Sequence, residues 1–137
     1  MKYVDTSAVL RLLCGEPGPT LALAASDRVV SSELLEVEAF RAIERQRLLG
    51  RLTDEETAVK RKELTDLVAM LDLVPMDRMV IDRARAAFGL NVRALDAIHV
   101  ATAEILAMEA GEGVEFWTHD ERQRLAALSR GLTVFGI

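Results

Sequence analysis

The sequence predicts an α/β protein with a central, mostly parallel five-stranded sheet flanked by about seven helices. Five short strand-like stretches alternate with longer helical stretches, and this alternation is typical of a parallel sheet covered on both faces. The strand-like stretches carry short apolar pairs such as Val29-Val30, which fit strands buried on both sides. With 137 residues, half of them hydrophobic, the chain is expected to form a single domain over residues 1–137.

The individual elements follow from strand propensity and helix-boundary signals. Strands are expected at residues 2–5, 28–31, 73–75, 114–118 and 132–135. Helices are expected at residues 8–14, in a short segment beginning at Pro17, and at 32–49, 54–71, 77–89, 93–108 and 120–129. Thr6 or Ser7 would begin the first helix, and Thr53 with Glu56 forms a capping box for the fourth.

Composition narrows the classes of function. The net charge of −5 argues against binding nucleic acid through a generally basic surface. It leaves a metal-dependent nuclease open, because carboxylates that hold metal ions create a local cationic site. The single cysteine suits a reducing compartment, and neither a signal-peptide pattern nor a membrane-spanning apolar run is present. We therefore expect a cytoplasmic protein that does not use the membrane.

Two carboxylates are expected at the ends of strands. Asp5 stands at the carboxyl end of the first strand, and Asp120 comes just after the fourth. In open α/β sheets, ligands bind beyond the carboxyl ends of the strands, where the strand order reverses. Each residue also has a structural alternative, because Asp is a favoured N-cap and both residues precede a helix.

The helix at residues 93–108 adds a third acid. This helix is apolar almost all round, which indicates a buried element, and Asp96 lies near its start on a face of small residues. A buried carboxylate needs a partner, which is either a cation such as Arg93 or a metal ion shared with Asp5 and Asp120. His99 is expected to be a packed, hydrogen-bonded residue rather than a zinc ligand, since no second His or Cys stands at ligand spacing.

The helix at residues 32–49 offers several glutamates. Most are expected to be solvated, and Glu38 could simply pair with Arg41 one turn on. Helical geometry alone does not choose between Glu36 and Glu38 as a site residue.

Four stretches together resemble the signatures of PIN domains, and most of all those of VapC-type toxins of toxin–antitoxin pairs. They are VDTSAVLRLL, SSELLEVEAFRAIER, ALDAIHVATAEIL and FWTHDERQRLAAL. The resemblance implies four acids converging at the carboxyl edge of the sheet. It selects Glu38 over Glu36, because Glu38 precedes Arg41 and a small residue as in the family pattern. The implied catalytic acids are Asp5, Glu38, Asp96 and Asp120, with Thr6, Ser7 and Thr118 as supporting hydroxyl residues.

The resemblance also implies a reaction and partners. Mg²⁺ or Mn²⁺, as one or two ions, prefers oxygen ligands, with Asp5 and Asp96 as main ligands and Glu38 and Asp120 bound directly or through water. A water held by the metal would attack an RNA phosphodiester in line. The protein would then be a toxin that forms a homodimer or a hetero-oligomer with a small antitoxin.

Other readings predict different behaviour. A receiver-like signalling module also gathers acids around Mg²⁺ but usually needs a late lysine, and the lysines here are Lys2, Lys60 and Lys62. A serine-type hydrolase is disfavoured, because neither His99 nor His119 stands with a nucleophile. The remaining alternative is a Mg²⁺-binding or vestigial PIN-like module that acts by binding a partner without catalysis.

Overall fold

The computed structural model describes residues 1–19 and 21–137. Five parallel strands form one sheet in the order β3-β2-β1-β4-β5. The strands are β1 (Lys2–Val4), β2 (Val29–Ser32), β3 (Asp72–Val74), β4 (Glu115–Trp117) and β5 (Thr133–Phe135). The helices are α1 (Thr6–Cys14), α2 (Leu34–Leu48), α3 (Asp54–Val68), α4 (Arg78–Ala84), α5 (Ala94–Ala110) and α6 (Glu121–Ser129). The predicted α/β class and parallel five-stranded sheet are therefore confirmed.

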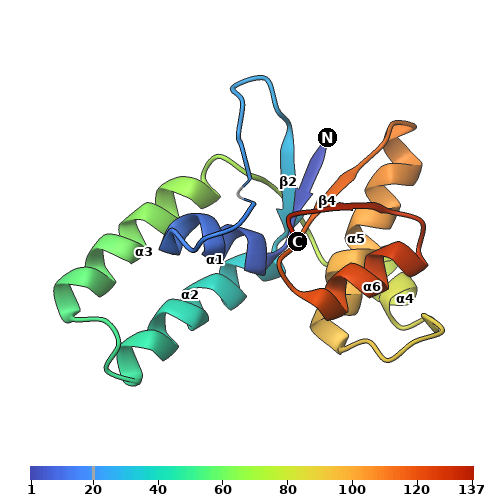
Figure 1. Cartoon of the computed structure of the whole chain (residues 1–137). Coiled ribbons are helices and arrows are strands. Elements are labelled where there is room, and N and C mark those ends of the chain that lie inside the picture. The colour runs from blue at the N-terminus through green and yellow to red at the C-terminus, as the bar shows by residue number, and fades with distance from the viewer. Residues whose placement is uncertain (20) are drawn as a thin grey trace.

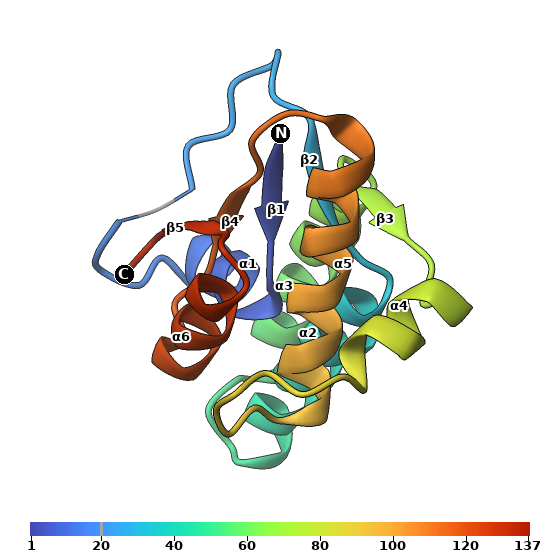
Figure 2. The same ribbon diagram turned by 90° about the vertical axis from the view of Figure 1, so that its right-hand side faces the viewer.

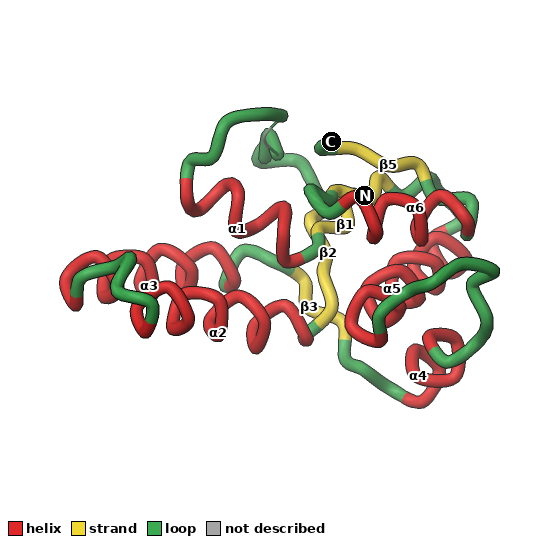
Figure 3. Tube along the Cα trace, turned by 60° about the horizontal axis from the view of Figure 1, so that its bottom comes forward, coloured by secondary structure: helices red, strands yellow, loops and turns green. Residues whose placement is uncertain are grey.

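The helices cover the sheet in two groups. On one face α1, α2 and α3 pack together, and on the other α5 lies between α4 and α6 (Figures 1 and 3). The first face buries a cluster that includes Val9, Leu35 and Leu64, and the second buries Tyr3, Val100 and Phe116 among others. Figure 2 shows α5 lying over the sheet with α4 and α6 on its two sides. The result is a three-layer sandwich in which helices cover both faces of the sheet, while the edge strands β3 and β5 stay partly exposed.

The strand order reverses beside β1, and this reversal is where open α/β sheets form a crevice. The chain builds β2 and β3 on one side of β1 and then returns to add β4 and β5 on the other side. Strands β1 and β4 are in register, so that Val4 lies opposite Trp117. The residues that follow these two strands, Asp5 and Thr118–Asp120, therefore lie next to one another where the strand order reverses.

Two details differ from the sequence predictions. The short helix expected at Pro17 does not form in residues 15–19, so the structure has six helices in the part of the chain that it describes. Pro17 and Pro19 have no N–H to donate, and Gly18 adopts a φ of +121°, which a helix does not allow. The helix capped by Asp77 also ends earlier than expected, at Ala84. Within the described residues no helix is long and apolar enough to cross a membrane.

Candidate active site

Asp5 is both the cap of the first helix and a buried corner of the site. Its Oδ1 accepts hydrogen bonds from the Ala8 amide at 2.9 Å and from Ser7 Oγ at 2.7 Å. Its Oδ2 faces the other way and accepts a hydrogen bond from Thr118 Oγ1 at 2.5 Å. Oδ1 caps the helix and Oδ2 faces the candidate site, so Asp5 can serve as a cap and as a site residue at the same time. The cap is Asp5 itself, not Thr6 or Ser7.

Burial governs the protonation of Asp5. Only 1% of the residue is exposed, and this burial raises the pKa of its carboxyl above the ordinary value of 3.8. Hydrogen bonds from Thr118, Ala8 and Ser7 and the nearby His99 act in the opposite direction but do not cancel the effect of burial on the pKa. The ionised form of Asp5 is therefore costly unless a cation approaches it.

The turn after β4 is tied to Asp5 by shared hydroxyls. Thr118 Oγ1 donates to Asp5 and accepts a hydrogen bond from the Asp120 amide at 3.0 Å. Ser7 Oγ likewise donates to Asp5 and accepts from the His119 amide at 2.8 Å. Asp120 Oδ1 accepts from the amides of Arg122 and Gln123, so Asp120 caps α6 as its structural alternative predicted. These bonds fix the end of β4 against the start of α1.

Glu38 contacts this region from α2. Its Oε1 accepts hydrogen bonds at 2.7 Å from Thr6 Oγ1 and at 2.7 Å from His99 Nε2. Partial burial raises the pKa of Glu38, but the hydrogen bonds from His99 and Thr6 act in the opposite direction, and the pKa is lowered. The ion pair considered with Arg41 is absent from the described residues. Glu36, by contrast, is exposed, so the folded chain separates two glutamates that helical geometry could not.

Asp96 completes the acidic group in the first turn of α5. Burial, and then the negative charges of Asp120, Asp5 and Glu38, raise the pKa of its half-buried carboxyl. In the part of the chain that the structure describes, no lysine or arginine forms an ion pair with Asp96, and this includes the expected candidate Arg93. The four acids thus form one electrostatically coupled group that no lysine or arginine of the described residues neutralises by an ion pair.

Sequence reasoning missed Gln123, which lies between two of these acids. Carboxylate oxygens only accept hydrogen bonds, so the amide nitrogen of Gln123 must face them. In that orientation the nitrogen lies 3.2 Å from Asp5 Oδ2 and 3.0 Å from Asp96 Oδ1. The side chain is 3% exposed. No sequence signal marks it, because an isolated Gln within a helix is usually a surface residue.

The fit of a divalent cation depends on the chemistry of these oxygens. Among residues 1–19 and 21–137, no three His, Cys, Asp or Glu side chains are gathered closely enough to hold a metal ion directly. Mg²⁺, however, usually keeps several waters and binds through one or two carboxylates. Asp5 and Asp96 provide two neighbouring carboxylates whose ionised forms lack a cation, and this suits a hydrated hard ion.

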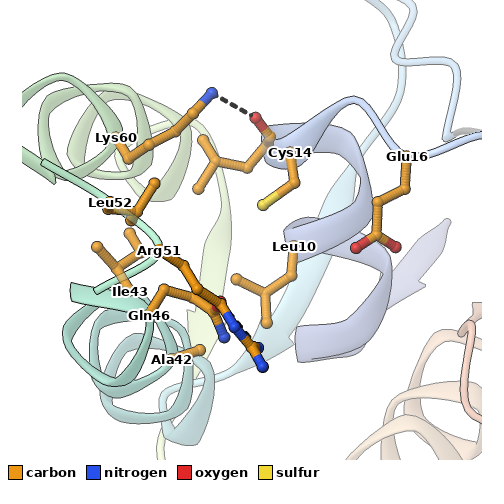
Figure 4. A pocket seen from close by; sticks show the side chains of 10 residues that line it. Leu10, Cys14, Glu16, Ala42, Ile43, Gln46, Arg51, Leu52 and Lys60 are labelled. Carbon is orange, nitrogen blue, oxygen red and sulfur yellow. Dashed lines mark hydrogen bonds between the residues drawn. The ribbon is translucent and has the colours of Figure 1, made fainter. Parts of the chain in front are cut away.

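Two hollows lie near the acidic group but differ in their linings. A cavity of about 510 Å³ between α1, α2 and α3 is lined by Leu10, Cys14 and Lys60 among others, and contains none of the four acids (Figure 4). Lys60 crosses its edge and donates to the Leu13 carbonyl at 2.9 Å. A second groove, of about 610 Å³, runs along α2 and has Glu38 in its wall. Of these two hollows, only the second is lined by one of the four acids.

Comparisons with known proteins give matches over most of the chain. The profile of the PIN domain family matches residues 2–128. The chain is 35% identical over 135 residues to ribonuclease VapC46 of Mycobacterium tuberculosis (strain ATCC 25618 / H37Rv), covering 96% of this chain and 94% of the relative. It is 30% identical over 123 residues to ribonuclease VapC47 of Mycobacterium tuberculosis (strain CDC 1551 / Oshkosh), covering 89% and 86%. The crystal structure of PAE2754 from Pyrobaculum aerophilum shares the fold, with a TM-score of 0.60 and 17% identity over 97% of this chain and 89% of that chain.

Proposed function

Because this chain belongs to the PIN domain family and, within it, to the VapC-type ribonucleases, we propose that it is a metal-dependent endoribonuclease. Residues 1–137 would form one nuclease domain, which acts as the toxin of a type II toxin–antitoxin pair. The observation that carries the proposal is the coupled group of Asp5, Glu38, Asp96 and Asp120, with which no lysine or arginine of the described residues forms an ion pair.

The electrostatics of the acids support a divalent cation. Burial raises the pKa of Asp5, and burial followed by the negative charges of Asp120, Asp5 and Glu38 raises the pKa of Asp96, so a bound cation would offset the cost of ionising both carboxyls. Asp5 and Asp96 would be the main ligands, with Glu38 and Asp120 completing the site directly or through water. When bound, Mg²⁺ or Mn²⁺ would polarise a phosphoryl oxygen and lower the pKa of water.

The protein's own residues hold the acids in place. Ser7 and Thr118 each use their proton on Asp5, which fixes both of its oxygens. Thr6 and His99 both bond to Oε1 of Glu38, and Oε2 takes no hydrogen bond from the described residues. With its pKa lowered, Glu38 stays ionised at neutral pH and presents Oε2 to a ligand or water. Fixed carboxylates of this kind need no reorganisation when a phosphodiester reacts.

The distribution of arginines supports a phosphate-bearing substrate despite the net charge of −5. Arg41 and Arg45 line the groove that contains Glu38. Arg93 precedes Asp96 by three residues and Arg122 follows Asp120 by two, and all four arginines are exposed. Their side chains make no ion pair or hydrogen bond with the described residues. Free arginines beside an acidic centre can neutralise the phosphates that flank the reacting one.

A cleavage assay tests the proposal. A structured RNA is incubated with the protein and Mg²⁺ or Mn²⁺, with EDTA, and with the Asp5→Asn variant, while Glu36→Gln serves as a charge-matched control. We expect cleavage that needs the metal, is lost in Asp5→Asn and persists in Glu36→Gln. Metal-dependent cleavage that survives Asp5→Asn would reject the site. Failure to cleave several RNAs would favour a PIN-like module that acts by binding a partner.

The toxin assignment has a separate test. The relatives carry the name VapC, and a small antitoxin is the partner that we propose for this chain. Expression of the chain alone should slow the growth of its host, and co-expression with the product of a short neighbouring gene should restore growth. Growth that is slowed equally by Asp5→Asn would mean that the effect does not come from the acidic site.

A further inference from the structure

The hydroxyl group of Tyr3 lies at the centre of a buried hydrogen-bond chain. Tyr3 is fully buried, and its Oη lies 3.2 Å from the backbone nitrogen of Ser32 in β2 and 2.8 Å from Nδ1 of His99 in α5. Nε2 of the same His99 ring lies 2.7 Å from Oε1 of Glu38 in α2. Four elements of the fold are thereby joined through two side chains.

The chemistry of the groups sets the direction of each hydrogen bond. A backbone N–H can only donate, so Ser32 occupies a lone pair of the Tyr3 oxygen. The Tyr3 hydroxyl has a single proton, and His99 Nδ1, 2.8 Å away, is the acceptor within reach among the described residues. Nδ1 is then an acceptor, and the ring carries its proton on Nε2. Glu38 is acceptor-only when ionised, and Nε2 donates to it.

We propose that Tyr3 and His99 are positioning residues that relay orientation from the backbone of β2 to the carboxylate of Glu38. The relay runs one way, as Ser32 N–H to Tyr3 Oη–H to His99 Nε2–H to Glu38 Oε1. Its effect on cleavage rests on the proposed nuclease function, whereas the protonation pattern of the ring does not. His99 is not a catalytic residue in this scheme, since one nitrogen faces Tyr3 and the other faces Glu38.

The packing around the relay makes it rigid. Phe116 stacks on Tyr3 with ring centroids 5.2 Å apart, and His99 meets Tyr3 edge-on at 6.0 Å and 75°. His99 is 1% exposed, so water does not compete for its nitrogens. Glu38 is less buried than either residue, and it depends on His99 and Thr6 for a fixed orientation. Hydrogen-bond partners behind metal-binding carboxylates and histidines typically change metal affinity or activity by about 10–100-fold.

Ring nitrogen resonances test the relay directly. The chain has two histidines, so a ¹⁵N spectrum of the metal-free protein can be assigned with a His119→Gln variant. We expect His99 to show a protonated Nε2 and a bare, hydrogen-bonded Nδ1 at neutral pH. In Tyr3→Phe the Nδ1 resonance should move to that of an unbonded ring nitrogen. A protonated Nδ1 in the wild type, or an Nδ1 resonance that Tyr3→Phe leaves in place, would overturn the relay.

The consequence for Glu38 is tested by Mn²⁺ titration. Tyr3→Phe should weaken Mn²⁺ binding about 10–100-fold, and it should have no further effect in a Glu38→Gln background, because the relay acts through Glu38. Thr57→Val is the matched control, since it removes a buried hydroxyl that donates to the Thr53 carbonyl in α3, away from the site. An equal loss in Thr57→Val, or an undiminished effect of Tyr3→Phe in Glu38→Gln, would reject the relay.

The two proposals fail in different ways. A wild-type protein that cleaves no RNA but shows the expected His99 resonances would refute the nuclease function and keep the relay. A nuclease whose His99 carries its proton on Nδ1 would keep the function and refute the relay.

Discussion

Replacing Asp96 by Asn should stabilise the metal-free protein at neutral pH. Asp96 and Asp5 both accept from the single amide nitrogen of Gln123, at 3.0 and 3.2 Å, so these two carboxylate oxygens lie no more than about 6 Å apart. An Asn side chain has nearly the same shape and keeps an oxygen that accepts the same bond, but it carries no charge. The substitution therefore removes repulsion with little change in packing.

The size of the effect follows from Coulomb's law. Two unit charges about 6 Å apart repel by about 0.7 kcal/mol in bulk water and by about 2.8 kcal/mol at an effective dielectric constant of about 20. Asp96 is half-buried, so solvent screening places the gain between these values. Loss of a negative charge from the first turn of α5 subtracts about 0.3–1 kcal/mol. The middle of the resulting range, a net gain of about 1 kcal/mol, should raise Tm by about 3–5 °C.

Thermal unfolding followed by circular dichroism in EDTA, between pH 4 and pH 8, measures this gain. The pKa of Asp96 is raised in the folded state, so its charge destabilises the fold as pH rises from the ordinary value of 3.8 through the folded pKa. The advantage of Asp96→Asn should therefore be largest at pH 7–8 and shrink toward pH 4. Saturating Mg²⁺ should stabilise the wild type and abolish the difference.

Glu36→Gln provides the matched control. Glu36 is the third residue of α2, as Asp96 is the third residue of α5, but Glu36 is exposed. Its replacement loses the same helix-dipole interaction and relieves no buried repulsion, so a small decrease in Tm is expected. If Asp96→Asn lowers Tm by the same amount at every pH, Asp96 is a structural residue and the coupled acidic group is refuted.

Three further outcomes are expected. Glu38→Gln should weaken Mn²⁺ binding about 10–100-fold in calorimetric titrations while Glu36→Gln leaves it unchanged, and equal losses would contradict the choice of Glu38. Fluorescence anisotropy measures how the affinity for RNA depends on salt. The double variant Arg41→Gln and Arg45→Gln should reduce the slope of log affinity against log salt concentration by about 2. An unchanged slope would exclude both arginines from RNA contact. Gln123→Leu should lower the metal-free Tm by about 3–8 °C, because it removes the donor between the two site aspartates, and a variant as stable as the wild type would show that the bridge contributes nothing.

The helices and strands could be predicted because caps and short apolar runs depend on residues that are close in the sequence. The capping box of Thr53 and Glu56 forms as predicted, with hydrogen bonds of 3.1 Å in both directions. The strands also lie close to the short apolar runs that predicted them. A strand that is buried on both faces is marked by its own apolar residues, so it can be recognised without knowing which strand pairs with it. The expected helix at Pro17 failed because two prolines and a positive-φ glycine follow one another within three residues.

The approach of two acids in the fold could also be predicted from the sequence. Asp5 and Asp120 stand directly after strands, and parallel strands end at one edge of the sheet, so their approach follows from topology. Whether each residue is a cap or a site residue could not be decided from the sequence. In the folded chain Asp5 uses one oxygen for the α1 cap and the other for Thr118, so capping does not exclude the proposed site role.

The sequence by itself determined the class of fold, the sheet edge at which acids gather and, through its four signatures, the PIN family. Only the tertiary structure placed His99 between Tyr3 and Glu38 and brought Gln123 between two aspartates. The physical reason is distance along the chain. Caps and strand ends depend on neighbours within a few residues, whereas each of these contacts joins residues 27 to 118 positions apart, and its side chains acquire partners only when the sheet and helices have packed.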